Sequence, residues 1–163
     1  TIHRDNNTDQ PKRLNAIFSA LIKISEKENI VLPLHPRTSK LLEKNLDAGL
    51  YQKLKTSENI KLIDPVSFLD MIALESNCKM VITDSGGVQK ESYFFEKACI
   101  ILRPETEWKE IVETGAAVIA DADEDKILKA YNEFITNSLS NYPEIFGDGK
   151  AAEFICETML ANI

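Results

Sequence analysis

The segment from residue 80 to residue 95 constrains the fold of this chain most, because its pattern changes abruptly in the middle. Residues 80–82 form an apolar run typical of a buried strand, and the residues after Ser85, Gly86 and Gly87 are typical of a helix. A strand, a turn of small residues and a helix in this order leave several backbone N–H groups unpaired at the helix N-terminus. Those groups and the helix dipole predict a site for a phosphate or a diphosphate.

The residue types in this segment refine the prediction. Gly86 and Gly87 carry no Cβ, so a ligand can approach the backbone closely, and Ser85 can cap the helix or donate its hydroxyl to a phosphate oxygen. Glu91 lies too far along the helix to bind phosphate, but its carboxylate could accept hydrogen bonds from paired sugar hydroxyls. The alternative is a capped helix with a glycine turn and no ligand. The spacing matches neither the dinucleotide-binding nor the P-loop pattern.

Short, almost wholly apolar strands alternate with helical patterns along the chain. This alternation predicts an α/β fold, a Rossmann-like doubly wound parallel sheet with helices on both faces. Ligands of such sheets bind beyond the carboxyl ends of the strands. His3, His35, Ser85 and Arg103 each follow an expected strand or begin the chain, so we expect them to gather at one edge. The expected strands are residues 30–34, 60–63, 79–83, 98–102 and 116–120.

Helix boundaries are predicted from capping patterns. Asp64 with Pro65 is expected to start the helix that carries Phe68 and Leu69, and Asp121 with Glu124 resembles a capping box. We further expect a loop with a short helical piece at residues 47–59, and a loop to residue 149 followed by a closing helix at about residues 150–160.

Composition excludes several classes of protein. The 163 residues are one domain by length, and a net charge of −7 argues against a nucleic-acid-binding surface. No apolar run has the length of a membrane span. Cys78, Cys99 and Cys156 lack metal-ligand spacing and lie in or beside apolar runs, which predicts buried free thiols and a reducing cytoplasm. The chain begins at Thr1 within a motif, so we interpret it as part of a longer protein.

Five motifs, in this order, resemble the C-terminal domain of the non-hydrolysing UDP-N-acetylglucosamine 2-epimerases. The resemblance covers essentially the whole chain and implies the second of two Rossmann-like domains, in the arrangement of one large glycosyltransferase class, with residues 1–163 as the UDP-binding domain and the N-terminal domain absent. The motifs are Thr1-x-His3-Arg4-x-x-Asn7, His35-Pro36, Asp84-Ser85-Gly86-Gly87-Val88-Gln89-x-Glu91, Arg103-x-x-Thr106-Glu107 and Gly147-Asp148-Gly149-Lys150-Ala151.

The resemblance implies an isomerase that needs no cofactor. UDP is eliminated to give a 2-acetamidoglucal and is re-added after protonation of C2 from the other face, which interconverts UDP-N-acetylglucosamine and UDP-N-acetylmannosamine. The carboxylates that do most of the proton transfer would lie in the N-terminal domain, and the complete protein would be a cytoplasmic homodimer. The isolated domain would be inactive.

Roles for individual residues also follow from the resemblance. Ser85, Gly86 and Gly87 would hold the diphosphate and Glu91 the ribose hydroxyls. The backbone at Val66 would contact the edge of the uracil, and Met71 would pack on its ring. His3 would be catalytic, near the sugar, and Arg103 would support the site. His35 would contact a regulatory nucleotide sugar.

The sequence departs from the family at Trp108, where an arginine is common. The Thr-Glu-Trp form resembles the branch that acts on UDP-2,3-diacetamido-2,3-dideoxyglucuronate, so the sugar could differ, because an aromatic ring cannot replace a guanidinium at an anionic group. Trp108 is a candidate substrate contact, although a tryptophan is more often a core residue. The alternatives for the other residues are a paired surface network for Arg103 and Glu107 and a plain turn residue for His35. A UDP-sugar glycosyltransferase and a non-catalytic nucleotide-sugar sensor are the other functional alternatives.

Overall fold

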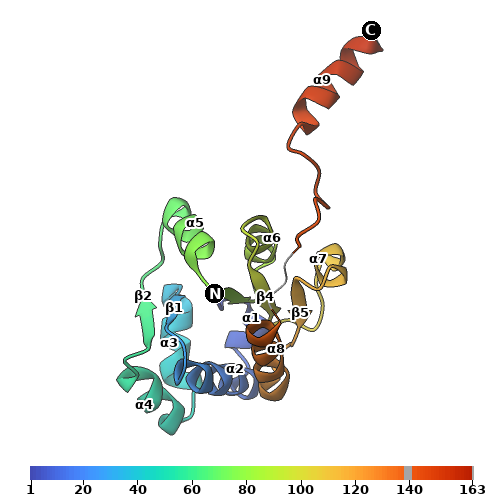
Figure 1. Cartoon of the computed structure of the whole chain (residues 1–163). Helices are drawn as coiled ribbons and strands as arrows, with labels where there is room; N and C mark the ends of the chain where they lie inside the picture. The colour runs from blue at the N-terminus through green and yellow to red at the C-terminus, as the bar shows by residue number, and fades with distance from the viewer. Residues whose placement is uncertain (138–140, 163) are drawn as a thin grey trace.

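A computed structural model describes residues 1–137 and 141–162, and in it strands and helices alternate as expected (Figure 1). Residues 138–140, part of the loop expected before residue 149, lie outside this range. The strands are β1 (Ile30–Pro33), β2 (Ile60–Ile63), β3 (Met80–Thr83), β4 (Ala98–Ile101) and β5 (Ala117–Ile119). The helices are α1 (Asp5–Thr8), α2 (Pro11–Ser25), α3 (Pro36–Asn45), α4 (Ala48–Thr56), α5 (Phe68–Asn77), α6 (Gly86–Phe94), α7 (Lys109–Glu113), α8 (Glu124–Thr136) and α9 (Ala151–Ala161).

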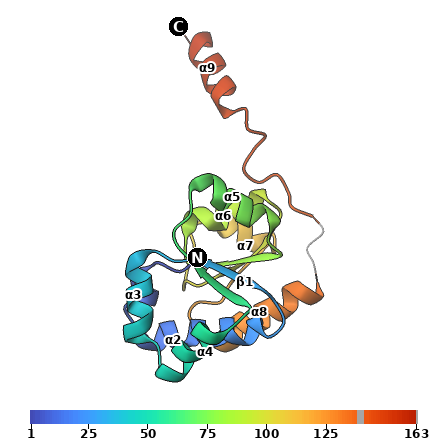
Figure 2. The same ribbon diagram turned by 90° about the vertical axis from the view of Figure 1, so that its left-hand side faces the viewer.

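All strand pairs are parallel, which confirms the predicted α/β class. β1 pairs with β2 in one sheet, and β3, β4 and β5 form a second sheet in that order. Helices α5, α6 and α7 lie on one side of the strands and α2 and α8 on the other, as both ribbon views show (Figures 1 and 2). The described strands therefore divide into two sheets, and the N-terminal residue Thr1 lies at the edge of β3 between them.

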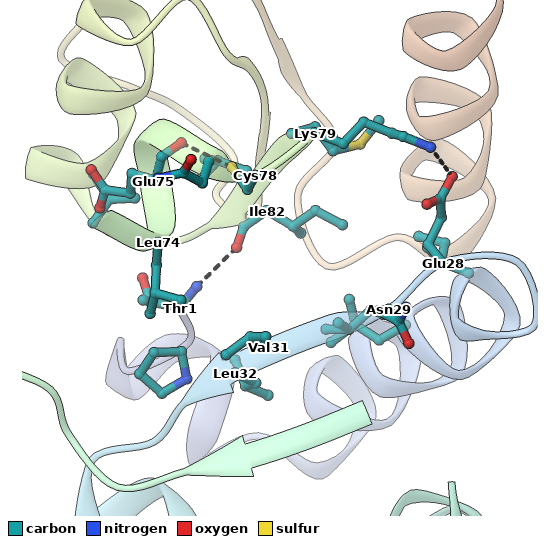
Figure 3. Close-up of a pocket in the computed structure, with 18 of the residues that line it drawn as sticks. Thr1, Glu28, Asn29, Val31, Leu32, Leu74, Glu75, Cys78, Lys79 and Ile82 are labelled. Atoms are coloured by element: carbon teal, nitrogen blue, oxygen red, sulfur yellow. Dashed lines mark hydrogen bonds and ion pairs between the residues drawn. The ribbon is translucent and has the colours of Figure 1, made fainter. Parts of the chain in front are cut away.

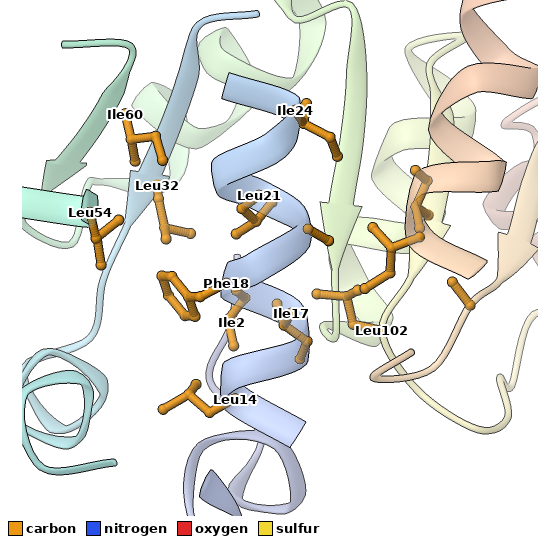
Figure 4. Close-up of a cluster of buried hydrophobic side chains, with 14 of the residues drawn as sticks. Ile2, Leu14, Ile17, Phe18, Leu21, Ile24, Leu32, Leu54, Ile60 and Leu102 are labelled. Atoms are coloured by element: carbon orange, nitrogen blue, oxygen red, sulfur yellow. The ribbon is translucent and has the colours of Figure 1, made fainter. Parts of the chain in front are cut away.

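The alternation of side chains along β4 divides the core into two clusters. Ile100 and Leu102 face a large cluster built around α2, whereas Cys99 and Ile101 face a smaller cluster beside α6 and α7. Figure 4 shows the larger cluster, where one face of α2 packs against the strands. These three β4 side chains and Leu102, which directly follows the strand, are fully buried. Burial on both faces explains why the strand sequences are continuous apolar runs.

Two helix starts differ from the prediction. α5 begins at Phe68 with Ser67 as its N-cap, because the Ser67 hydroxyl accepts a hydrogen bond from the N–H of Asp70 at 3.2 Å. Asp64 and Pro65 precede the helix instead of starting it, and Phe68 and Leu69 are 67% and 74% exposed instead of buried. A hydroxyl three positions further on provides the cap that the carboxylate of Asp64 was expected to give.

At α8 the predicted capping box is also wrong. Asp123 caps the helix by accepting from the N–H of Lys126 at 3.0 Å. Asp121 has a φ of 55° and pairs with Arg13. Residues 47–59 are mostly helix rather than loop, since α4 covers nine of them.

The closing helix α9 forms as predicted but buries no residue, and it projects away from the rest of the chain (Figures 1 and 2). Its exposed apolar side chains are Phe154, Ile155, Met159 and Leu160. The prediction of three buried thiols holds for Cys99 only, because Cys78 is partly buried and Cys156, on α9, is exposed. Within residues 1–137 and 141–162, no helix is both long and apolar enough to cross a membrane.

Candidate functional site

The buried carboxylate of Asp84 organises the site. It follows β3 directly, and its oxygens accept hydrogen bonds from the backbone N–H groups of His3 and Arg4, both at 3.0 Å, and from the side-chain amide of Asn7 at 3.0 Å. Asn7 also donates to the carbonyl oxygen of Leu102 at 2.8 Å. The carboxyl ends of β3 and β4 are therefore tied to the first turn of the chain. The sequence motif contained Asp84, but we did not assign it a role.

His3 is placed by this network at the end of β3, as predicted. Its Nδ1 lies 3.3 Å from Oδ1 of Asp84, and its side chain is 45% exposed. Thr1 completes the junction, because its hydroxyl lies 2.7 Å from that of Thr83. The imidazole thus has one nitrogen beside a buried carboxylate while much of the ring faces open space. This geometry suits a group that contacts a ligand and exchanges a proton with it.

The N-terminus of α6 presents free backbone N–H groups, as the sequence predicted. The first backbone bond of the helix runs from the N–H of Gln89 to the carbonyl of Ser85. In the described part of the chain, no hydrogen bond uses the N–H groups of Gly86, Gly87 or Val88. The Ser85 side chain makes no capping bond, so its hydroxyl also remains available. Three N–H groups can donate hydrogen bonds to an anion here, and the positive end of the helix dipole favours its charge.

Glu91 lies closer to this helix end than its sequence spacing suggested. One carboxylate oxygen of Glu91 and the hydroxyl of Ser85 each lie 4.0 Å from the point where a Cβ on Gly87 would be. The carboxylate therefore folds back along α6 and flanks the same glycine as the Ser85 hydroxyl. An acceptor and a donor group thus lie at the same distance from a position that glycine leaves open.

Arg103 forms a bidentate ion pair with Glu107, with both N···O distances 2.8 Å. The guanidinium lowers the pKa of the Glu107 carboxyl, and Glu107 raises the pKa of Arg103. A Cβ on Gly86 would lie 3.4 Å from Glu107 Oε2 and 3.8 Å from Arg103 Nη1. The pair thus stands directly beside the helix N-terminus, so the paired network is present, and the supporting role of Arg103 stays a prediction.

Trp108 connects the same loop to α6. Its Nε1–H donates to the carbonyl oxygen of Gly86 at 2.7 Å, and the ammonium of Lys90 lies 4.6 Å from the centre of its ring. The side chain belongs to the smaller core cluster and also fixes the backbone of the glycine turn. Gln89, a residue that sequence reasoning left without a role, adds a second connection, because the hydroxyl of Thr106 donates to its Oε1 at 2.6 Å.

The other predicted residues meet in a cavity of about 380 Å³ next to His3. Val66 and Met71 line it, as does His35. The imidazole of His35 also accepts a hydrogen bond from the N–H of Arg37 at 3.3 Å and so caps α3. His35 therefore has the structural role in the turn that was the alternative to a ligand contact. Four residues predicted for uracil, sugar or regulatory contacts therefore share one cavity. Ser85, Gly86, Gly87 and Glu91 are not among the residues that line it, but Ser85 directly follows Asp84, whose carboxylate accepts a hydrogen bond from the N–H of His3.

A second cavity, of about 420 Å³, lies between β1 and β3 (Figure 3). Its lining is mainly apolar, and Figure 3 shows Glu75 and Cys78 on one side and Val31 and Leu32 on the other. Thr1 is at its end, where the terminal ammonium donates to the carbonyl oxygen of Ile82 at 3.0 Å. No cluster of three or more potential ligands for a metal ion occurs within residues 1–137 and 141–162.

Fold and site together define a Rossmann-like α/β domain in which a helix N-terminus with free N–H groups lies beside a cavity lined by two histidines. The chain belongs to the UDP-N-acetylglucosamine 2-epimerase family, since the family model of that description matches residues 1–160. This membership confirms the resemblance seen in the motifs.

Individual relatives agree with this assignment. The chain is 43% identical over 159 residues to a UDP-N-acetylglucosamine 2-epimerase homolog of Methanococcus maripaludis, covering 98% of this chain and 43% of the relative. It is 39% identical over 158 residues to the UDP-2,3-diacetamido-2,3-dideoxy-D-glucuronate 2-epimerase of Pseudomonas aeruginosa, covering 96% and 42%. The chain thus spans less than half the length of these relatives.

A solved structure of similar fold carries ligands. The UDP-GlcNAc 2-epimerase of Methanocaldococcus jannaschii in complex with UDP-GlcNAc and UDP superimposes with a TM-score of 0.85 at 37% identity, covering 98% of this chain and 44% of that chain. A second structure of the enzyme from this organism gives a TM-score of 0.88 at 36% identity.

Proposed function

We propose that this chain is the UDP-binding domain of a non-hydrolysing UDP-N-acetylglucosamine 2-epimerase. The observation that carries the proposal is the helix N-terminus of α6, where three free N–H groups stand beside the carboxylate of Glu91. A diphosphate would accept from Gly86, Gly87 and the Ser85 hydroxyl. The ribose hydroxyls would donate to Glu91. Relatives at 37–39% identity that carry this enzyme's name support the same substrate.

The reaction would proceed by elimination and re-addition. The C2–H and C1–O bonds break, UDP leaves with the C1–O electron pair, and a 2-acetamidoglucal forms. UDP then attacks C1 again while C2 accepts a proton on the opposite face. The N–H groups of α6 would stabilise the charge that develops on the departing diphosphate. His3, next to the buried Asp84, would contact the diphosphate or the sugar and would hold or transfer a proton there.

We further propose that the complete protein has an N-terminal domain with the acid and base groups, and that this domain covers the cavity of His3 and His35. The second cavity, the groove between β1 and β3, supports the proposal that further residues precede Thr1. Thr1 bonds to β3 as in a parallel ladder, since its ammonium donates to Ile82 and its carbonyl accepts from Asp84. A strand running into Thr1 would fill the groove and join the two sheets. The exposed apolar face of α9 would pack on the same missing part.

A specific observation favours a second substrate. Trp108 stands where the resemblance to the family leads us to expect an arginine, and the Pseudomonas relative at 39% identity acts, by its name, on UDP-2,3-diacetamido-2,3-dideoxy-D-glucuronate. In this chain the Trp108 ring is held by Gly86 and Lys90, so it shapes the edge of the diphosphate site. The second candidate is therefore the 2-epimerase of that sugar nucleotide.

The decisive experiment is to incubate the full-length protein separately with the two sugar nucleotides, without any acceptor, and to follow C2 by NMR in D₂O. Epimerisation appears as a second sugar signal with deuterium at C2. Turnover of one nucleotide alone identifies the substrate. Binding of UDP without any epimer or glucal would contradict the proposal and favour a sensor, and transfer of the sugar only after an acceptor is added would favour a glycosyltransferase.

Two further expectations belong to the complete protein. We expect a homodimer, which light scattering coupled to size-exclusion chromatography measures directly. We also expect a cytoplasmic location, where an exposed thiol such as that of Cys156 stays reduced. Residues 1–163 alone are expected to bind UDP weakly and to show no epimerisation.

A further inference from the structure

Helix α5 buries a single residue in the described chain, and that residue is a glutamate. Glu75 is only 2% exposed, although Phe68 and Leu69 on the same helix point into open space. Neither carboxyl oxygen of Glu75 accepts a hydrogen bond from a donor group of the described residues. A buried carboxyl group without donors is costly in its ionised form. Its presence in place of an apolar residue therefore calls for an explanation.

The group that faces Glu75 is the carboxyl of Glu91. Burial raises the pKa of Glu75 to about 7, and the negative charge of Glu91 on α6 is the next largest cause. The two carboxyls lie within hydrogen-bonding reach, which acts in the same direction. The terminal ammonium of Thr1 opposes the shift only in a chain that begins at Thr1. The thiols of Cys78 and Cys99 also face this region, and burial raises the pKa of both. Two carboxyls can share a hydrogen bond only when one of them carries a proton.

The other side of Glu91 is the candidate ligand site. Its Oε1 lies 4.0 Å from the point where a Cβ on Gly87 would be, next to the free N–H groups of α6. Glu91 is partly exposed whereas Glu75 is buried. The Glu91 carboxylate thus stands between a buried carboxyl group and the place where a nucleotide would bind.

We propose that Glu75, in its protonated form, is a positioning residue that donates a hydrogen bond to the carboxylate of Glu91 and holds it beside Gly87 for the two hydroxyls of a ribose. This inference rests on the proposed function. The hydrogen bond keeps the negative charge on Glu91, which then accepts from the ligand. When Glu75 ionises, the two carboxylates repel each other and Glu91 turns away from Gly87. Affinity for a nucleotide therefore falls as the pH rises through neutrality.

The test is a calorimetric titration of UDP into the full-length protein between pH 6 and pH 8.5. Two variants separate the roles of the proton, since the Glu75→Gln amide donates at every pH and Glu75→Leu cannot donate at all. Because UDP itself titrates near pH 6, the readout is the ratio of the Kd of wild type to that of Glu75→Gln at each pH. We expect this ratio to rise about tenfold across the range, and Glu75→Leu to bind about tenfold more weakly than Glu75→Gln throughout.

Further variants keep the outcome interpretable. In a Glu91→Ala background the difference between Glu75→Gln and Glu75→Leu should disappear, since the group to be positioned is gone. Glu58→Gln, at an exposed position just before β2, is the matched control and should follow wild type. Circular dichroism confirms that each variant folds. A constant ratio, or equal affinities of Glu75→Gln and Glu75→Leu, would overturn the inference while leaving the proposed function intact. Absence of UDP binding in wild type at every pH would instead overturn the proposed function.

Discussion

The backbone N–H of His3 donates to the buried carboxylate of Asp84 across 81 positions of sequence, at 3.0 Å. The same carboxylate accepts from the N–H of Arg4 and the amide of Asn7. A single residue at the end of β3 therefore fixes both the catalytic candidate His3 and, through the next peptide, the start of the Ser85-Gly86-Gly87 turn. The two halves of the candidate site share one buried charge.

Replacement of Asp84 by asparagine should destabilise the chain. The amide keeps one acceptor oxygen but turns its NH₂ group toward donors, so buried N–H groups lose their partner. We expect a loss of about 3 kcal/mol in the free energy of unfolding, measured by urea denaturation of residues 1–163. Asp123→Asn at the N-cap of α8 is the matched control, because asparagine caps nearly as well as aspartate. Equal losses in the two variants would refute the organising role of Asp84.

An alanine at Gly87 should damage binding but not stability. Gly87 is the second residue of α6, its φ is not positive, and a new Cβ would meet no atom closer than 4.0 Å. Its methyl group would lie 4.0 Å from both the Ser85 hydroxyl and the Glu91 carboxylate, where we expect the ligand to approach. We expect an unfolding free energy within about 1 kcal/mol of wild type and an affinity for UDP reduced by about tenfold or more.

Gly49→Ala provides the matched control for this prediction. Gly49 is likewise the second residue of its helix, and nothing lies within 4 Å of its Cβ position. The substitution should leave UDP affinity unchanged. If both alanines leave it unchanged, the ligand does not approach the backbone at Gly87. Thermal melts and calorimetric titrations on the same samples decide this.

Substitutions of Ser85 and Glu91 should change different kinetic constants of the complete enzyme. Glu91→Ala removes an acceptor for ribose hydroxyls, a contact made equally in substrate and transition state. Its loss is worth about 1.5–3 kcal/mol, so KM should rise while kcat changes less. Ser85→Ala removes a donor to the leaving diphosphate, where charge grows in the transition state, so kcat should fall. Steady-state kinetics measure both. A Glu91→Ala variant that loses kcat at constant KM would place Glu91 at the reacting atoms instead.

The fold was largely predictable because both faces of its strands are buried. When both faces are buried, an apolar run alone is enough to predict a strand, and each of the five expected strands is present as β1 to β5. Helix starts were less predictable, because several hydroxyls and carboxylates compete as caps within a few residues. Ser67 took the place of Asp64, and Asp123 that of Asp121.

The site was predictable where a local pattern carries the chemistry. The free N–H groups of α6 follow from the strand–glycine–helix order alone. The roles of Asp84, Gln89 and Glu75 depend instead on partners far away in sequence, such as His3 or the loop of Thr106. A single sequence contains the residues of such contacts but not their pairing. The role of Glu75 in particular requires the packing of α5 on α6.

Removal of α9 should leave the stability of the domain unchanged. The helix buries none of its side chains, so truncation after Gly149 exposes no core. We expect the unfolding free energy to change by less than about 0.5 kcal/mol, and the truncated chain to associate less, because four large exposed apolar side chains are gone. Urea denaturation and light scattering measure the two effects. A loss of several kcal/mol would show that α9 packs on the domain in solution.

The stability of the chain should depend on pH through Glu75. The carboxyl has a pKa of about 7 when folded, against a usual value of 4.5. The folded state therefore keeps a proton that the unfolded state releases, so the stabilisation is complete below about pH 4.5 and is lost as the pH rises toward 7. Wild type should lose stability relative to Glu75→Gln over this window, by about 3 kcal/mol at most. Urea denaturation of both proteins at pH 4.5 and pH 8 measures the difference, in which the titration of other groups largely cancels. An equal difference at the two pH values would mean that Glu75 is ionised already in the folded chain.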